Sequence, residues 1–152
     1  MFDAEEWLRS VSDAVRWERN DKAFVEALRA SSLSLGCQLR DVVVSSSGSG
    51  DRMAASDELV DHTERLRRGQ WARDLVDEAK EVFAGMRMVG VAEQEAANVL
   101  QLVHLQLVPH EAVARMLGMS PSTERRRYRY GVDWLGGNGL AHAKAGYGVA
   151  VS

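Results

Sequence analysis

Proline, the residue that most strongly interrupts helices, occurs only twice in the 152 residues of the chain, at positions 109 and 121. A proline inside a helix removes a backbone hydrogen bond and clashes with the preceding turn, so a chain this poor in proline can form long uninterrupted helices. Its apolar residues recur at spacings of three and four, which is the period of an amphipathic helix. The sequence therefore predicts an all-α fold.

The N-terminal part, residues 1–90, is expected to form a helical hairpin. Trp7 and Val11 belong to the apolar stripe of its first helix, and the second helix is expected to begin near Ser56, whose hydroxyl can cap it. A run of Ser and Gly separates the two helices, and we predict a flexible loop over about 42–54. Two helices bury such stripes incompletely, so we interpret the hairpin as an oligomerisation unit that forms a homodimer through coiled-coil contacts.

The next part, residues 91–136, has a denser apolar pattern with signals for short helices. One helix is expected to start at Pro109 and to end at Gly118, which can adopt the left-handed conformation that stops a helix. Ser120 and Pro121 then favour a new helix start, as its N-cap and its first residue. A short helix, a turn that begins with Gly and a capped helix rich in Ser, Thr and Arg are typical of a helix-turn-helix.

The basic residues gather in this C-terminal part, although the net charge of the whole chain is −3. Residues 1–108 carry a charge balance of −6 and residues 109–152 one of +3, with four arginines within positions 125–129. This asymmetry indicates a basic contact surface joined to an acidic body. We therefore predict a recognition helix over about 120–135, followed by a Gly-rich tail over 137–152.

The segment Glu111–Ser120 reads EAVARMLGMS and resembles the E-I-A-x-x-L-G-x-S core of the last DNA-binding region of bacterial sigma factors. Over about residues 7–135 the chain is similar to a family of small phage-encoded proteins that carry such a module behind a helical hairpin. Late-gene transcription activators of the RinA and ArpU type are relatives of that family. The resemblance implies a phage or prophage transcriptional regulator that binds double-stranded DNA, and it adds RNA polymerase as a second candidate partner.

Two other functions remain open for this sequence. A small terminase subunit for DNA packaging also joins a helix-turn-helix to an oligomerising hairpin. A helical adaptor protein whose helix-turn-helix no longer binds DNA is the second alternative. Salt-dependent DNA binding would separate the first two functions from the adaptor.

The side chains expected to touch DNA follow from the helical wheel of the recognition helix. With Tyr128 facing the core, Thr123, Arg126 and Tyr130 are expected to point away from it. The first turns of a recognition helix reach base edges, whereas further arginines contact phosphates, as we expect for Arg127 and Arg129. The predicted DNA-binding residues are Ser120, Ser122, Thr123, Arg125, Arg126, Arg127, Arg129 and Tyr130.

One residue departs from the family pattern. Glu124 stands four residues after the capping Ser120, where the related proteins usually have an apolar residue, and it shares the face of Tyr128. Either Glu124 lies at the rim and pairs with an arginine, or the recognition helix is rotated about its axis.

The sequence contains no recognisable catalytic, metal or cofactor site, so we expect a protein that is not an enzyme. The single Cys37 has no second thiol beside it, and the glycines near the C-terminus lack the order of a phosphate-binding loop. No run of about 18 apolar residues is present, so no membrane partner is expected, and the cytoplasm is the predicted compartment. The four histidines are scattered along the chain, at His62, His104, His110 and His142.

Overall fold

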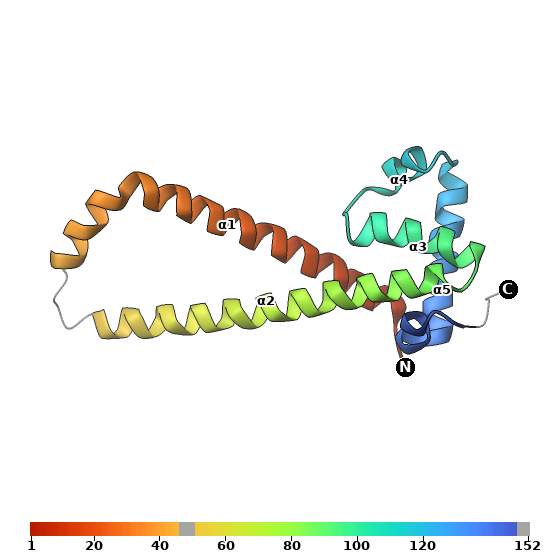
Figure 1. The fold of residues 1–152 in the computed structure, drawn as a ribbon, viewed down its shortest axis with the longest axis horizontal. Coiled ribbons are helices and arrows are strands. Elements are labelled where there is room, and N and C mark those ends of the chain that lie inside the picture. The colour runs from red at the N-terminus through yellow and green to blue at the C-terminus, as the bar shows by residue number, and fades with distance from the viewer. Residues whose placement is uncertain (46–50, 149–152) are drawn as a thin grey trace. The chain divides into compact units, whose positions relative to one another are not determined.

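The computed structural model describes the backbone of residues 1–45 and 51–148, and the side chains of residues 1–31 and 60–148. This part of the chain contains five helices and no strand, which confirms the predicted all-α fold. The helices are α1 (Ala4–Ser45), α2 (Asp51–Arg87), α3 (Val91–His104), α4 (His110–Met116) and α5 (Pro121–Ala145) (Figure 1).

The two long helices extend further toward each other than the sequence predicts. The loop was expected over about 42–54, but α1 continues to Ser45 and α2 already begins at Asp51, five residues before the expected start at Ser56. Neither flank contains a proline or glycine, so no residue there interrupts a helix. The rest of the predicted loop, residues 46–50, lies outside the described residues.

The chain divides into two compact units, which we call the core unit (residues 1–15 and 72–152) and the hairpin unit (residues 16–71). This division differs from the predicted boundary at residue 90. The reason is that the first turns of α1 and the last turns of α2 bury their apolar side chains together with α3 and α5, in one cluster. The first turns of α1 and the last turns of α2 therefore belong to the same unit as α4 and α5.

The core unit is built around one apolar cluster. Trp134 of α5 and Phe83 of α2 are the largest side chains that are fully buried in it. Such burial stabilises a fold by about 25 cal/mol for each Å² of apolar surface removed from water. The members of the cluster are spaced three and four residues apart on each helix, as in Leu8 and Val11 of α1 or Ala79, Val82, Phe83 and Met86 of α2.

Helices α3 and α5 approach each other closely at Gly131. A Cβ atom on this glycine would lie 2.8 Å from Leu100 Cδ1 and 3.1 Å from the Cβ of Ala96, both on α3. A side chain at position 131 would therefore push α5 away from α3, and the absence of one sets their spacing.

The predicted tail over 137–152 is wrong for its first part, because a second helical segment of α5 follows the Gly-rich run. Gly139, with φ 82° and ψ 167°, is not helical and divides α5 into two helical segments, the second of which ends at Ala145. Ala143 is fully buried, and its backbone oxygen lies so close to Gly85 of α2 that no Cβ atom would fit between them. Packing against α2 therefore keeps the second part of α5 helical where the glycines alone would favour a stop.

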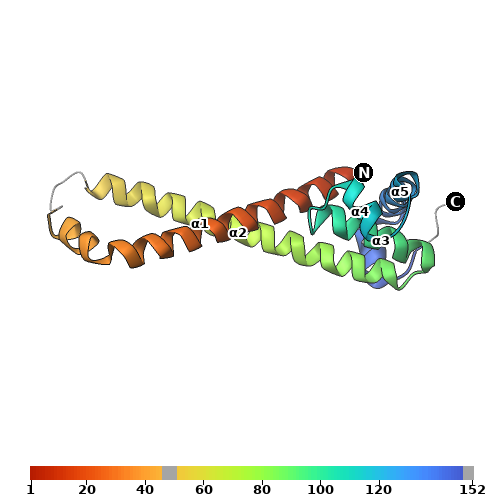
Figure 2. The ribbon, with the colours of Figure 1, turned by 90° about the horizontal axis from the view of Figure 1, so that it is seen from above.

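The hairpin unit buries few of its side chains. Its two helices are antiparallel in both views (Figure 1, Figure 2), and Arg65 of α2 pairs with Asp21 of α1 and stacks over Phe24 at 4.4 Å. Within residues 16–31 and 60–71, where side chains are described, the only buried residue is Gly69. The exposed ones include Phe24, Leu28, Val60, Leu66 and Trp71.

Candidate nucleic-acid interface

Helices α4 and α5 form a helix-turn-helix whose turn is fixed by local hydrogen bonds. Gly118 adopts the left-handed conformation with φ 67°, and the amide of Met119 donates to the carbonyl of Ala114 at 2.9 Å. Ser120 caps α5 by accepting from the amide of Thr123 at 3.2 Å, and Pro121 occupies the first helical turn. These are the roles that the sequence assigned to Gly118, Ser120 and Pro121. Pro109 differs slightly, because it is the N-cap of α4 rather than its first helical residue.

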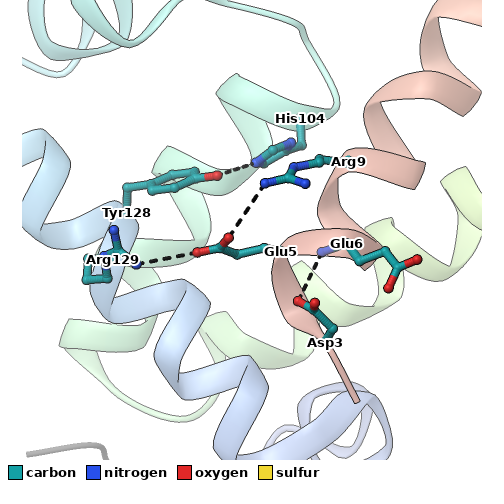
Figure 3. A network of polar contacts seen from close by, with 7 residues as sticks. All are labelled: Asp3, Glu5, Glu6, Arg9, His104, Tyr128 and Arg129. Carbon is teal, nitrogen blue, oxygen red and sulfur yellow. Dashed lines mark hydrogen bonds and ion pairs between the residues drawn. The ribbon is translucent and has the colours of Figure 1, made fainter. Parts of the chain in front are cut away.

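A chain of polar contacts joins the helix-turn-helix to α1. Ser12 Oγ lies 2.7 Å from Nδ1 of the buried His104, and His104 Nε2 lies 2.9 Å from the hydroxyl of Tyr128 (Figure 3). The ring of Tyr128 also meets the ring of His110 edge to face, with 4.8 Å between centroids. Because buried polar groups are costly unless they are hydrogen-bonded, these contacts favour one orientation of α5 against α1 and α3.

Glu124 continues these contacts and corrects the sequence prediction. Only 1% of its surface is exposed, and its Oε1 lies 2.6 Å from Nδ1 of His110 on α4. Neither predicted arrangement holds, because Glu124 is buried beside a histidine rather than paired with an arginine at the rim. Helix α5 is also not rotated, since Val132 and Leu135 face the core as expected.

The surroundings of Tyr128 raise the pKa of its phenol above the usual value of 10.0. Burial of the ring is the main cause, and the negative charges of Glu5 and Glu124 act in the same direction. The positive charges of Arg129 and Arg9 act in the opposite direction. The phenol of Tyr128 therefore remains protonated and neutral over the physiological pH range.

Most of the predicted DNA-binding side chains face solvent on α5. The exposed ones are Ser120, Ser122, Arg125, Arg126 and Arg129, whereas Thr123, Arg127 and Tyr130 are half-buried. For Tyr130 the prediction of an outward direction is wrong. Its hydroxyl donates to Oε1 of the buried Glu93 on α3 at 2.9 Å, and its ring packs against the core. The wheel missed this contact because it treated α5 as packed on one side only.

The four arginines of the basic run have different partners. Arg127 Nε lies 3.3 Å from Oε2 of Glu95 on α3, and Arg129 lies 3.4 Å from Oε1 of Glu5 on α1. For Arg125 and Arg126, no hydrogen bond or ion pair occurs within residues 1–31 and 60–148. A cleft between α3 and α5 is lined by Ala92, Glu95, Thr123, Arg126, Arg127 and Tyr130.

Three residues at or behind this surface were not predicted from the sequence. Ser12 and His104 orient Tyr128 from α1 and α3, and only the fold shows that they meet. Arg115 lies on the exposed side of α4, next to the helix-turn-helix turn. A signal for Arg115 was present, because it falls inside the EAVARMLGMS segment at a position between the apolar residues.

Other kinds of site find no support in the described residues. No group of three or more His, Cys, Asp or Glu residues within them could hold a metal ion. The described helices also lack any stretch that is both long and apolar enough to span a membrane. What the structure does show is three exposed arginines on α5, Arg125, Arg126 and Arg129, with the hydrogen-bonded Tyr128 and Glu124 behind them.

A comparison of the chain with protein-family models, with curated proteins and with solved structures finds no match. The described residues therefore show an all-α protein in which α4 and α5 are joined by a tight turn. What that surface binds has to be argued from its geometry.

Proposed function

We propose that this protein is a phage or prophage transcriptional regulator that binds double-stranded DNA with the first turns of α5 in the major groove. The observation that carries the proposal is the set of exposed side chains Ser122, Arg125 and Arg126 at the N-terminal end of α5, directly after a capped helix-turn-helix turn. In a helix-turn-helix this end of the second helix meets the base edges. The regulator role and the phage origin rest on the resemblance over residues 7–135.

Several features support the DNA-binding part of the proposal. Arginine presents two donors that match the acceptors of guanine, and Arg126 has no competing contact within the described side chains. Arg115 on α4 adds a positive charge where the first helix of such a motif crosses the phosphate backbone. The helix-turn-helix also has a defined position in the core unit, because Glu124 and Tyr128 are hydrogen-bonded to neighbouring helices. The partnered Glu124 weakens the alternative of an adaptor with a decayed motif.

We also propose that the protein acts as a homodimer that is joined through its hairpin unit. The only buried residue among the described side chains of that unit is Gly69, so its apolar residues have no core of their own. A second copy would cover Phe24, Leu28 and Leu66 in a four-helix arrangement. A two-fold dimer would also place two recognition helices on neighbouring half-sites, which doubles the contacts with DNA. RNA polymerase remains a proposed second partner, on the resemblance to sigma factors alone.

The experiment is fluorescence anisotropy of labelled prophage DNA at two salt concentrations, with Arg126→Ala compared with wild type. We expect binding that weakens with salt, because arginines displace counterions from phosphates. Arg126→Ala should cost about 1–3 kcal/mol on the preferred site and little on random DNA. Lys144→Ala is the matched control, since Lys144 lies near the far end of α5 and pairs with Glu78. Absence of binding at low salt would overturn the proposal in favour of an adaptor.

A further inference from the structure

The basic run of α5 contains two kinds of arginine, which differ in their contacts within the protein. Arg125 and Arg126 have no carboxylate partner among the described side chains. Arg127 and Arg129, in contrast, each lie beside a carboxylate of another helix, Glu95 on α3 and Glu5 on α1. The sequence places all four arginines in one group, and only the fold separates them.

We propose that Glu95 and Glu5 compete with DNA phosphates for Arg127 and Arg129, and thereby limit the binding of DNA irrespective of its sequence. This inference rests on the proposed function, since it concerns the same surface. It assigns Glu95 and Glu5 a regulatory effect on that surface, although neither carboxylate contacts DNA itself.

Glu95 holds Arg127 within the cleft between α3 and α5. The ion pair is partly shielded, with 33% of the Arg127 side chain and 41% of the Glu95 side chain exposed. A second contact, from Arg127 Nη1 to Met119 Sδ at 3.7 Å, holds the same guanidinium against the turn. To reach a phosphate, Arg127 has to leave both partners. Binding through Arg127 is therefore weaker than binding through an arginine that makes neither contact.

Glu5 acts on a different pair of arginines. It lies in the first turn of α1 between Arg9, at 3.7 Å, and Arg129, at 3.4 Å (Figure 3). One carboxylate between two guanidinium groups lowers the local charge from +2 to +1 and attracts both of them. The N-terminal turn of α1 therefore weakens the positive field of α5 at the turn that contains Arg129.

The two ion pairs affect specific and non-specific binding differently. Affinity for DNA of any sequence comes mainly from phosphate contacts, and each phosphate neutralised adds about −0.9 to the slope of log affinity against log salt. A contact of Arg126 with a base edge depends less on salt, and Arg126 forms no ion pair with Glu5 or Glu95 that it would have to break. Withholding Arg127 and Arg129 from phosphates therefore raises the ratio of specific to non-specific affinity.

The test uses the full-length variants Glu95→Gln and Glu5→Gln, alone and combined, because glutamine keeps the shape and removes the charge. Affinity for a random-sequence duplex is measured by fluorescence anisotropy over a series of salt concentrations. Each variant should bind about two- to fivefold more tightly than wild type, the range expected when an exposed ion pair no longer has to be broken. The salt slope should become steeper by about 0.9 for each arginine released.

Two controls separate this effect from a general change in charge. Glu78→Gln removes the same charge from the core unit, where Glu78 pairs with Lys144 at 2.9 Å, and it should leave the salt slope unchanged. In an Arg127→Ala background, Glu95→Gln should have no effect, because the competing arginine is absent. An equal gain from Glu78→Gln, or a persistent gain without Arg127, would overturn the inference.

The remaining outcomes distinguish this inference from the proposed function. If wild type binds DNA and neither glutamine variant changes affinity or slope, the inference is wrong and the function stands. If only the variants bind, the inference is supported in its strongest form, as autoinhibition. If no form of the protein binds at the lowest salt concentration, the proposed function fails and the inference fails with it.

Discussion

Glu124 occupies a position of α5 that faces the interior, where a carboxylate is costly unless it is hydrogen-bonded. His110 provides that partner from α4 at 2.6 Å, and its own side chain is 42% exposed. The pair thus joins the two helices of the helix-turn-helix at a point where an apolar contact would ordinarily be found. We expect Glu124 and His110 to stabilise the fold through their contact with each other, rather than each by itself.

Removal of one partner should therefore destabilise the protein, and removal of both should restore part of the loss. His110→Ala leaves the buried carboxylate of Glu124 without its partner and should cost about 1–3 kcal/mol in urea unfolding at neutral pH. The double variant His110→Ala, Glu124→Leu places an apolar side chain in the space of the carboxylate. It should lose less stability than the single variant His110→Ala. A double variant with the summed losses of the two single variants would show that the residues do not interact.

Tyr128 makes the stability of the fold depend on alkaline pH. Burial first, and the charge of Glu5 second, raise the pKa of its phenol in the folded state above 10.0. The unfolded chain then releases this proton at lower pH than the folded one, so the free energy of unfolding should decrease as pH rises above about 10. Tyr128→Phe should be less stable at neutral pH, because it loses the bond to His104, but should lose less stability above that pH.

Urea unfolding at neutral and alkaline pH provides the measurement. Tyr147→Phe is the matched control, since Tyr147 is exposed, and this variant should follow the wild-type pH dependence. Equal alkaline losses in Tyr128→Phe and wild type would contradict the assignment to Tyr128.

At the scale of the helices, the spacing of α3 and α5 depends on the missing side chain at position 131. Gly131→Ala places a Cβ atom 2.8 Å from Leu100 Cδ1, and such overpacking should destabilise the protein by about 1–3 kcal/mol. Gly137→Ala is the control within the same helix, because no atom lies within 4 Å of its Cβ position. The control should be neutral or more stable by up to about 1 kcal/mol, through its higher helix propensity. Thermal unfolding of both variants checks this, and equal effects would contradict the packing argument.

The sequence predicts the helices best where a local signal fixes a helix end. Ser120 and Pro121 define the start of α5, and Gly118 defines the preceding turn, because capping and left-handed backbone depend on a few adjacent residues. The Gly-rich run that ends at Gly139 does interrupt α5, but it does not show that a second helical segment follows. That second segment packs on α2 through Ala143, and a local pattern contains no such contact.

At the candidate interface, too, the sequence predicts what depends on one helix but not the contacts between helices. That Arg126 faces outward follows from helical periodicity alone. The carboxylates beside Arg127 and Arg129 come from residues 32 and 124 positions away in the chain, at Glu95 and Glu5. The sequence could therefore show where the charge lies, but not which part of it is already paired.

At the scale of the whole molecule, the hairpin unit should determine the oligomeric state. Sedimentation equilibrium at micromolar concentration should give about twice the chain mass of 16.8 kDa. Leu66→Glu in the hairpin unit should dissociate the dimer, because it places a charge in the apolar contact. Val91→Glu, at an exposed apolar position of the core unit, should leave it intact.

The mass also discriminates among the proposed functions. A value near 16.8 kDa for wild type would contradict the dimer. A ring of many subunits would favour a terminase-like packaging protein over a regulator.

Amide chemical-shift mapping shows whether α4, the turn at Gly118 and the start of α5 bind DNA. A short mixed-sequence duplex is added to the ¹⁵N-labelled full chain, and the shift of each amide is followed. If the proposed function is right, the largest changes lie in α4, in the turn at Gly118 and in the first turns of α5, from Ser120 to about Tyr130. Changes confined to residues 16–71, or no change at all at low salt, would contradict it.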